Sequence, residues 1–309
     1  MNTEYSIAIR TLGKAGIKYQ QMLDSIKQLT IQPQKIIVYI AEGYEIPKET
    51  INEEIYVYTR KGMVAQRAIQ FKEIETEYCL FLDDDVYLAP DSVEKMFQAL
   101  EKYKADVISP ALFLHKFSFL QFVVLNVVPH NDKNYAYKIL PSGGFSYNET
   151  KNRDVCLSES NSGPCFLCKK NTMLSINLNN ELWLDDTGYA LWDDQTMFYK
   201  MYLSGYKILT IFNSGIVHLD ASSSKLGVDI IEKIVYADSR NRLIFWYKFI
   251  YKQKRGFLSK TKVIIALYYS YIMQLLLFSA SSVKHLSLNR TKAFIKGIKD
   301  AIIYINKKK

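Results

Sequence analysis

Cysteine is scarce in this sequence, with four among 309 residues. Such few and scattered cysteines exclude a secreted scaffold held together by disulfides. Cys165 and Cys168 have the spacing of a zinc or redox pair, but no second pair follows that would complete a zinc site. Their apolar neighbours instead predict a buried strand with reduced thiols.

Other features are missing as well. The N-terminus has no signal-peptide pattern, because residues 1–4 lead directly into a strand-like run. No internal repeat is visible, and a chain that is 49% hydrophobic and 23% charged is typical of a globular protein rather than a disordered one. We therefore expect one large or two modest domains whose main part stays in the cytosol.

Acidic residues are rare in the last part of the chain. Residues 221–309 contain 18 Lys and Arg against 4 Asp and Glu, whereas residues 1–220 contain 22 against 27. The net charge of +9 therefore comes from the tail. This basic tail indicates a contact with anionic lipid or with nucleic acid. The change in composition predicts a domain at 1–220 and a basic helical extension at 221–309.

Apolar runs and helical periodicity alternate through residues 1–220. The apolar runs predict strands at 5–11, 35–40, 55–58, 78–82, 106–110, 165–168, 206–211 and 215–218. Helical spacing predicts helices at 19–29, 63–74, 91–103 and 192–203. Between about 111 and 160 the pattern fades, and we expect a functional lid or binding loop there. The alternation predicts an α/β fold with a mainly parallel sheet covered on both faces.

Three consecutive carboxylates, Asp83, Asp84 and Asp85, follow the apolar run that starts at Tyr78. Because the mutual repulsion of the three carboxylates costs free energy, their clustering indicates a hard cation or a hydroxyl-rich ligand beside them. Open α/β sheets carry their chemistry at the carboxyl ends of strands, which is where these residues lie. The alternative is a solvated acidic turn before the helix that begins near Pro90.

A second acidic pair, Asp193 and Asp194, opens the helix predicted at 192–203. Helix dipoles favour carboxylates in the first turn, so capping is one interpretation. In the other, Trp192 offers a flat face on which a sugar could stack, and one carboxylate takes a proton from a hydroxyl. His218 ends an apolar strand, and with the acidic triplet it would make an oxygen-and-imidazole site for Mg²⁺ or Mn²⁺.

The order of these motifs over residues 5–220 resembles a family 2 glycosyltransferase of the GT-A fold, the nucleotide-diphospho-sugar transferase fold. The shared order is a strand, a helix, a strand with an acidic end, an Arg-bearing helix, Phe-Leu-Asp-Asp-Asp, a Gly-rich acceptor loop, Trp-Asp-Asp, Gly-Tyr and a final His. The resemblance implies a metal-dependent, inverting hexosyltransferase that uses a nucleotide-diphosphate sugar and Mn²⁺ or Mg²⁺.

The resemblance also implies which residues bind the metal and the donor. The triplet matches the D-x-D motif of the family, with Asp85 as a metal ligand and Asp83 or Asp84 nearer the ribose. His218 falls where the family often places a further metal ligand.

The acceptor side of the reaction is implied by the second acidic pair. Asp193 and Asp194 match the Glu-Asp pair of the family, and the eleven residues from Asp194 to Gly205 equal its usual spacing. Asp194 would be the general base, with Gly163 of the Gly-rich loop, Trp192 and Asp193 also on the acceptor side. The replacement of Glu by Asp193 keeps the charge.

Two further positions would contact the nucleotide. Thr11 takes the place of the Pro-Thr threonine near the base, and Arg67 falls where the family has Ala-Arg-Asn, facing the base or the diphosphate. Ala41 replaces the usual aspartate after the second strand and leaves Glu42 as the base contact, and Ala68 replaces the usual asparagine. The first change leaves uridine, thymidine and guanosine open, with UDP or dTDP sugars favoured.

The start of the extension resembles one group within this family. Tyr236 followed by Arg240 and Asn241 is similar to a motif of bacterial rhamnosyltransferase-like and galactofuranosyltransferase-like members. In those relatives a basic helical tail holds the enzyme on the cytosolic membrane face, where the acceptor is a saccharide or a polyprenyl-linked saccharide of cell-surface polysaccharide synthesis. The same motif places Arg240 on the acceptor side.

Residues 257–309 have membrane-like patterns. Residues 263–283 are 21 residues without charge, enough to cross a hydrocarbon core of about 30 Å as a single spanning helix. Basic residues on both flanks and a thin polar stripe favour a helix that lies on the inner face of the plasma membrane instead. The helix expected at 291–306 is amphipathic and basic. The plainer alternative is that both helices pack on the first domain.

Two other classes of protein remain as alternatives. A haloacid-dehalogenase-like phosphatase also places D-x-D after an apolar strand, but its motif requires Thr or Val at the position where this chain has Tyr87. A basic membrane- or RNA-binding scaffold without catalysis would explain the tail, yet it leaves both acidic clusters unexplained. The tail also lacks Gly-rich and RNP-like motifs, so we expect no nucleic-acid partner.

Overall fold

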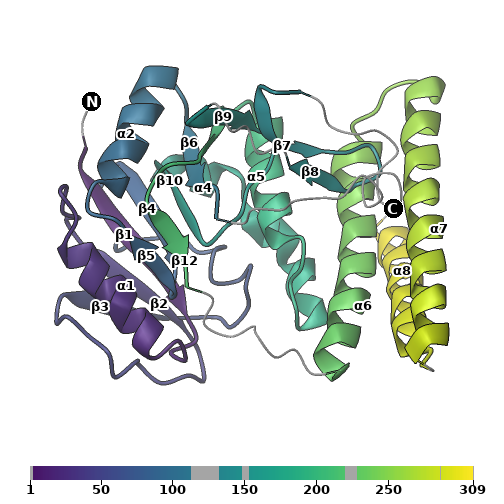
Figure 1. Ribbon diagram of the computed structural model, residues 1–309, viewed down its shortest axis with the longest axis horizontal. Coiled ribbons are helices and arrows are strands. Elements are labelled where there is room, and N and C mark those ends of the chain that lie inside the picture. Colours follow the sequence, from purple (N-terminus) through teal and green to yellow (C-terminus); the bar gives the residue numbers. More distant parts are fainter. Residues whose placement is uncertain (1–2, 113–131, 148–152, 220–227, 286, 309) are drawn as a thin grey trace.

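A ten-stranded sheet forms the centre of the computed structural model, which describes residues 3–112, 132–147, 153–219, 228–285 and 287–308. Its strand order is β3-β2-β1-β4-β10-β6-β11-β9-β7-β8 (Figure 1). The first four strands of the chain pair in parallel, because each connection returns the chain to the same end of the sheet. They are β1 (Tyr5–Thr11), β2 (Ile36–Ala41), β3 (Glu54–Thr59) and β4 (Tyr78–Asp83).

The other half of the sheet is mixed. β10 (Cys165–Lys169) runs antiparallel between β4 and β6 (Val107–Pro110), and β11 (Ile208–Ile211) runs parallel to β6. The far edge consists of β9 (Val155–Ser158), β7 (Tyr135–Ile139) and β8 (Phe145–Tyr147). Beyond the end of β4, β5 (Val86–Leu88) and β12 (Ile216–His218) form a separate two-stranded sheet. This pairing brings His218 beside the residues that follow Asp83.

Helices cover both faces of the large sheet. Ile7 and Ile9 of β1 share a core cluster with buried residues of α1 (Ile17–Lys27) and α2 (Ser92–Tyr103). Ala8, which points the other way, shares a cluster with α5 (Asp193–Leu203), α4 (Lys170–Ser175) and the 3₁₀ segment η1 (Leu178–Thr187). Together with the helical end of the chain, these layers confirm the predicted fold class.

The extension contributes three long helices. They are α6 (Val228–Phe245), which continues into the π-helical segment η2 (Trp246–Tyr251), α7 (Phe257–His285) and α8 (Asn289–Lys307). Figure 1 shows them side by side at the end of the molecule that lies far from α1 and α2. Phe245 and Phe294 of the extension belong to the same core cluster as Trp192 and Phe198. The extension therefore packs on the sheet domain through a shared hydrophobic core.

The helix predicted at 63–74 is wrong, because the structure has turns there. The segment is held by contacts with distant residues that are incompatible with a regular helix. Gln66 donates from its side chain to the backbone oxygens of Thr11 and Tyr39, at 3.1 Å each. Phe71 has a φ of 47°, in the left-handed region that non-glycine residues rarely adopt.

The long insertion expected at 111–160 is only partly irregular. Its described part supplies β7, β8 and β9, which extend the sheet, so the expectation of an irregular segment is wrong there. Residues 113–131 and 148–152 lie outside the described residues. The buried strand with reduced thiols is confirmed, since Cys165 and Cys168 are buried and free in β10. The helices expected at 91–103 and 192–203 are also present.

Candidate active site

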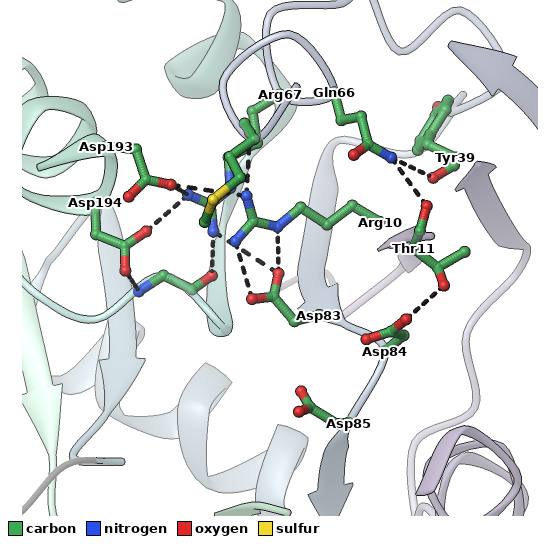
Figure 2. Close-up of polar contacts among 12 residues, drawn as sticks. Arg10, Thr11, Tyr39, Gln66, Arg67, Asp83, Asp84, Asp85, Asp193 and Asp194 are labelled. Atoms are coloured by element: carbon green, nitrogen blue, oxygen red, sulfur yellow. Dashed lines mark hydrogen bonds and ion pairs between the residues drawn. The ribbon is translucent and has the colours of Figure 1, made fainter. Parts of the chain in front are cut away.

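The acidic triplet lies where the carboxyl ends of two parallel strands meet. β4 ends at Asp83, and Asp84 and Asp85 form the turn to β5. The register between β1 and β4 places Arg10 opposite Asp83. Figure 2 shows Arg10 and Thr11 pointing toward the first two carboxylates, while Asp85 lies apart from them with no contact drawn to it.

Arg10 holds Asp83 with two nitrogens. Its Nη2 donates to Asp83 Oδ2 at 2.9 Å, and its Nε donates to Oδ1 of the same carboxylate. A two-point pair of this kind fixes the carboxylate in place and neutralises it. No sequence motif marks Arg10, and its role depends on the β1–β4 register, which only the folded chain reveals.

The Asp84 side chain is half-buried, and its pKa is shifted. Burial raises the pKa of Asp84 to about 6, against the hydrogen bond that the Thr11 hydroxyl donates to it. The neighbouring charges of Asp83 and Asp85 raise the pKa further, and Arg10 lowers it. Thr11 also accepts a hydrogen bond from the backbone N–H of Gly13, at 2.7 Å. Thr11 therefore links the end of β1 to the triplet.

Asp85 and His218 form a separate pair. His218 Nε2 lies 3.2 Å from Asp85 Oδ1, and the backbone N–H of Leu219 donates to the Asp85 carbonyl oxygen. A carboxylate and an imidazole at this separation can face one divalent cation. Within the described part of the chain, no three His, Cys, Asp or Glu side chains converge in this way. The protein can thus supply two ligands to a cation here.

The second acidic pair belongs to a network around Arg67. Arg67 Nη1 donates to Asp194 Oδ1 at 2.7 Å and to Asp193 Oδ2 at 3.2 Å. Its Nη2 donates to the Gly163 carbonyl oxygen at 2.8 Å, and the Gly163 N–H donates to Asp194 Oδ2 at 2.8 Å. Arg67, Gly163 and Asp194 therefore close a ring (Figure 2), which sequence reasoning had not joined.

Gly163 allows this close approach because it has no side chain. A Cβ atom at this position would collide with the Asp194 carboxylate and with the Arg67 guanidinium. Arg67 is held from the other side by Asp185 of η1, which accepts from the N–H groups of Val64 and Ala65 at 3.1 and 2.9 Å. The turn that carries Arg67 is thus fixed at its start as well as at its tip.

The two carboxylates of this pair have opposite pKa shifts. Burial and the adjacent Asp194 raise the pKa of Asp193. Burial would also raise the pKa of Asp194, but the charges of Arg67 and Arg10 and the hydrogen bonds from Arg67 and Gly163 outweigh it and lower the pKa. Asp194 is therefore the ionised member of the pair, and Asp193 is the member that takes up a proton first.

The triplet, Arg10 and His218 line a cleft of about 670 Å³ at the ends of β1 and β4, whereas the described lining does not include Arg67, Gly163, Asp193 or Asp194. This is an ordinary volume for a small-ligand site. The lining includes Arg10, Thr11, Lys14, Lys61, Asp83, Asp84, Asp85, Tyr189 and His218. Glu42 lies in an adjoining pocket of about 560 Å³ together with Tyr44 and Glu45, and Lys14 and Lys61 line both spaces. The ion-pair network leads from Asp83 through the two arginines to Asp193 and Asp194.

The side chains of Trp192 and Arg240 are buried in contacts within the protein and are not open to an acceptor. Trp192 is 7% exposed, and its ring packs against Phe145 and Phe245 at centroid distances of 6.1 and 5.6 Å. The expected open face for a sugar is therefore covered. Arg240 lies in α6 and donates to the Trp183 carbonyl oxygen at 2.9 Å and to Asp186 at 3.2 Å. It joins the extension to η1.

Comparison with known proteins agrees with this arrangement. Residues 22–164 match the family model described as Glycosyl transferase family 2. The matched stretch contains Arg67, the triplet from Asp83 to Asp85, and Gly163, and it ends before α5 and His218. No curated protein matches the chain. Residues 22–164 are therefore similar to glycosyltransferase family 2, and this similarity supports glycosyl transfer as the general activity of the chain.

Proposed function

We propose that the protein is an inverting hexosyltransferase that moves a sugar from a nucleotide-diphosphate sugar to a saccharide or polyprenyl-linked acceptor. The reaction would serve bacterial cell-surface polysaccharide synthesis, with residues 1–220 as catalytic domain and 221–309 as a membrane-associating extension. One observation carries the proposal: the acidic triplet shares a single cleft with His218 and with three basic side chains. Such a cleft suits a diphosphate bound together with a cation.

The donor would lie along the two adjoining pockets. Lys14 and Lys61 line both, so their ammonium groups can meet the phosphate oxygens between base and sugar. Glu42 then faces the base of a UDP or dTDP sugar, and Thr11 lies at the start of the same path. Asp83 and Asp84, held by Arg10 and Thr11, would accept hydrogen bonds from the ribose hydroxyls. Arg67 would add positive charge behind Asp83, from which it is 3.8 Å away.

Asp85 and His218 would hold Mn²⁺ or Mg²⁺. Such a cation can be coordinated by a carboxylate oxygen and an imidazole nitrogen together. Asp85 Oδ1 and His218 Nε2 lie 3.2 Å apart, close enough to bind the same ion. When bound, the cation would neutralise charge on the leaving diphosphate. Arg10 and the two lysines supply further positive charge to the same oxygens.

Asp194 would act as the general base. The acceptor hydroxyl attacks the anomeric carbon, its proton passes to the Asp194 carboxylate, and the bond from the anomeric carbon to the phosphate oxygen breaks. A single displacement inverts the stereochemistry. Arg67 and Gly163 fix the carboxylate in place, and each of its oxygens retains a lone pair for the incoming proton. Gly163 and Asp193 would shape the acceptor side, while Trp192 and Arg240 hold the surrounding loop.

The extension would place the enzyme on the inner face of the plasma membrane. Residues Phe257–Ala280 of α7 are apolar and long enough to span, and 28% of that window is buried. Val263, Ala266, Leu267 and Tyr271 face the protein, while the opposite side is exposed and apolar at Ile265, Tyr268, Ile272 and Leu276. Lys292, Lys296 and Lys299 of α8 are exposed as well. A helix buried along one face and apolar along the other favours a position on the surface of anionic lipid.

A thermal-shift panel of nucleotide sugars, with and without Mn²⁺, tests the proposal. A true donor at about one hundred times its Kd should stabilise the protein by about 2.7 kcal/mol, which raises Tm by about 4 °C. We expect this shift with a UDP or dTDP sugar plus metal, and little with the matching nucleoside monophosphate. If RNA stabilises the protein and no nucleotide sugar does, the scaffold alternative is correct and the proposal is wrong.

A further inference from the structure

Helix α6 of the extension contacts the loop that carries the candidate base. The Trp192 indole Nε1–H donates to Asp238 Oδ1 at 2.7 Å, and the Asn241 side chain donates to the Leu191 carbonyl oxygen at 2.9 Å. Trp192 immediately precedes Asp193 in the sequence and forms the N-cap of α5. Two side chains of α6 therefore hold the two residues that lead into the acidic pair.

The loop that ends at Trp192 needs contacts from outside to stabilise it, because its backbone conformation is unfavourable on its own. Trp192 has a φ of 76°, in the left-handed region that costs a bulky residue free energy unless its surroundings impose it. Its backbone carbonyl accepts from the N–H of Thr196 at 2.9 Å, in the first turn of α5. Trp192 thus connects the bond from its indole to Asp238 with the first turn of α5, where Asp193 and Asp194 lie.

A second connection leads from α6 to the partner of the base. Arg240 of α6 binds the Trp183 carbonyl oxygen and Asp186, both in η1. The adjacent Asp185 accepts from the backbone N–H groups of Val64 and Ala65, in the turn that carries Arg67. Both members of the Arg67–Asp194 pair are therefore connected to α6. Trp192 makes the connection for Asp194, and η1 makes it for the turn that carries Arg67.

Asp238 itself is partly buried, which is costly for a carboxylate. Its surroundings include the Trp192 donor and the charge of Arg242, whose Nη2 donates to Ser270 at 2.6 Å. Burial raises the pKa of Asp238, and Arg242 and the indole N–H lower it. An aspartate in this position contributes a directed acceptor for one indole, which an apolar side chain of similar size cannot do.

We propose that α6 is a positioning element of the active site, with Asp238 as the residue that orients Trp192 and hence Asp194. The inference rests on the proposed role of Asp194 as the base. It assigns the extension a part in turnover in addition to any role at the membrane. Asp238 touches neither donor nor acceptor in this scheme and acts only through the loop.

The test compares Asp238→Leu with Asp238→Asn in the full-length chain. Leucine removes the acceptor, and a misplaced base should lower kcat about 10- to 100-fold with little change in donor affinity. Asparagine keeps an acceptor oxygen and should retain kcat within about threefold. Asp300→Leu is the matched control, because Asp300 accepts from the Tyr236 hydroxyl at 2.8 Å wholly within the extension. That control should keep wild-type kcat and donor affinity.

Trp192→Phe provides a second route that keeps the aromatic packing and removes only the donor. Combined with Asp238→Leu, it should cause no further loss of kcat, since both substitutions remove the same hydrogen bond between residues 192 and 238. Additive losses in this cycle, or equal losses in Asp238→Leu and Asp300→Leu, would overturn the inference. Asp194→Asn separates it from the proposed function. Wild-type turnover in Asp194→Asn refutes the base itself, whereas an inactive Asp194→Asn with a fully active Asp238→Leu refutes only the positioning role.

Discussion

The two halves of the site are held in different ways. On the donor side, Asp83, Asp84 and Asp85 lie at strand ends, and their partners come from the neighbouring strands β1 and β12. On the base side, Asp194 is held by Arg67 and Gly163, and its loop is held by α6 of the extension. The proposed donor half thus has its carboxylates at strand ends, whereas the proposed base half depends on contacts among α5, the turn that carries Arg67 and α6.

This difference predicts which changes affect binding and which affect turnover. Substitutions among the strand ends should weaken donor binding and leave the base in place. Substitutions around Arg67 and α5 should reduce turnover while the donor still binds.

Asp194→Asn should have the largest effect. Loss of the base should reduce transfer about 10²- to 10⁴-fold, because asparagine cannot take the acceptor proton. Donor affinity, measured by titrating a nucleotide sugar and metal into the mutant, should remain within about twofold. Normal turnover with normal donor affinity would remove Asp194 from the mechanism.

Gly163→Ala should come next. The added methyl group collides with Asp194 and Arg67, so we expect a loss of turnover of about tenfold or more and a stability cost of about 1–3 kcal/mol. Ser162→Ala is the control, since the buried Ser162 hydroxyl makes no hydrogen bond within the described residues. Steady-state kinetics and urea unfolding of the pair check this. Equal behaviour of the two variants would show that the ring around Arg67 tolerates displacement.

Arg10→Gln tests the donor half. It leaves Asp83 without its two-point partner, and the freed carboxylate would repel the diphosphate. We expect donor affinity to fall about tenfold, which corresponds to about 1.4 kcal/mol, with a smaller change in kcat at saturating donor. Isothermal titration with the nucleotide sugar gives the affinity. A fall in kcat alone would instead assign Arg10 to the base side, through its 3.8 Å approach to Asp193.

Arg67→Gln should shift a pH profile, the smallest of these effects. Arg67 lowers the pKa of Asp194, so the base stays ionised at acidic pH and activity falls only below that lowered pKa. Without Arg67 the pKa rises, and the acid limb of kcat at saturating donor should move to higher pH. The stability that the ionised carboxylate contributes above its unfolded pKa should be lost as well. Arg67→Lys keeps the charge and should move the limb less; an unmoved limb in Arg67→Gln would contradict the pairing.

Sequence patterns predicted the position of the acidic triplet, because its signals are local. An apolar run followed by Asp83, Asp84 and Asp85 indicates a strand end directly, and parallel strands bring such ends to one edge. Arg10 was missed because its pairing with Asp83 depends on which strand lies next to β4. The residues around Arg10 contain no pattern that indicates this neighbour.

The base half was predicted less well, for a physical reason. The spacing from Asp194 to Gly205 indicated the helix, which is present. The helix expected around Arg67 is replaced by turns, because Gln66 and the caps from Asp185 tie that segment to other strands and to η1. The covered ring of Trp192 follows from a partner 46 positions later, Asp238, which no local pattern around Trp192 reveals.

Gly297 in α8 gives the extension a further property. A Cβ atom there would lie 2.6 Å from the Tyr236 carbonyl oxygen and would also collide with Ser239, so α6 and α8 touch backbone to backbone at this point. Helices in such close contact cannot slide or tilt independently. For a protein bound to lipid through α7 and α8, this rigidity would hold the cleft at a constant height above the bilayer. The length of a lipid-linked acceptor would then decide whether its growing end reaches Asp194.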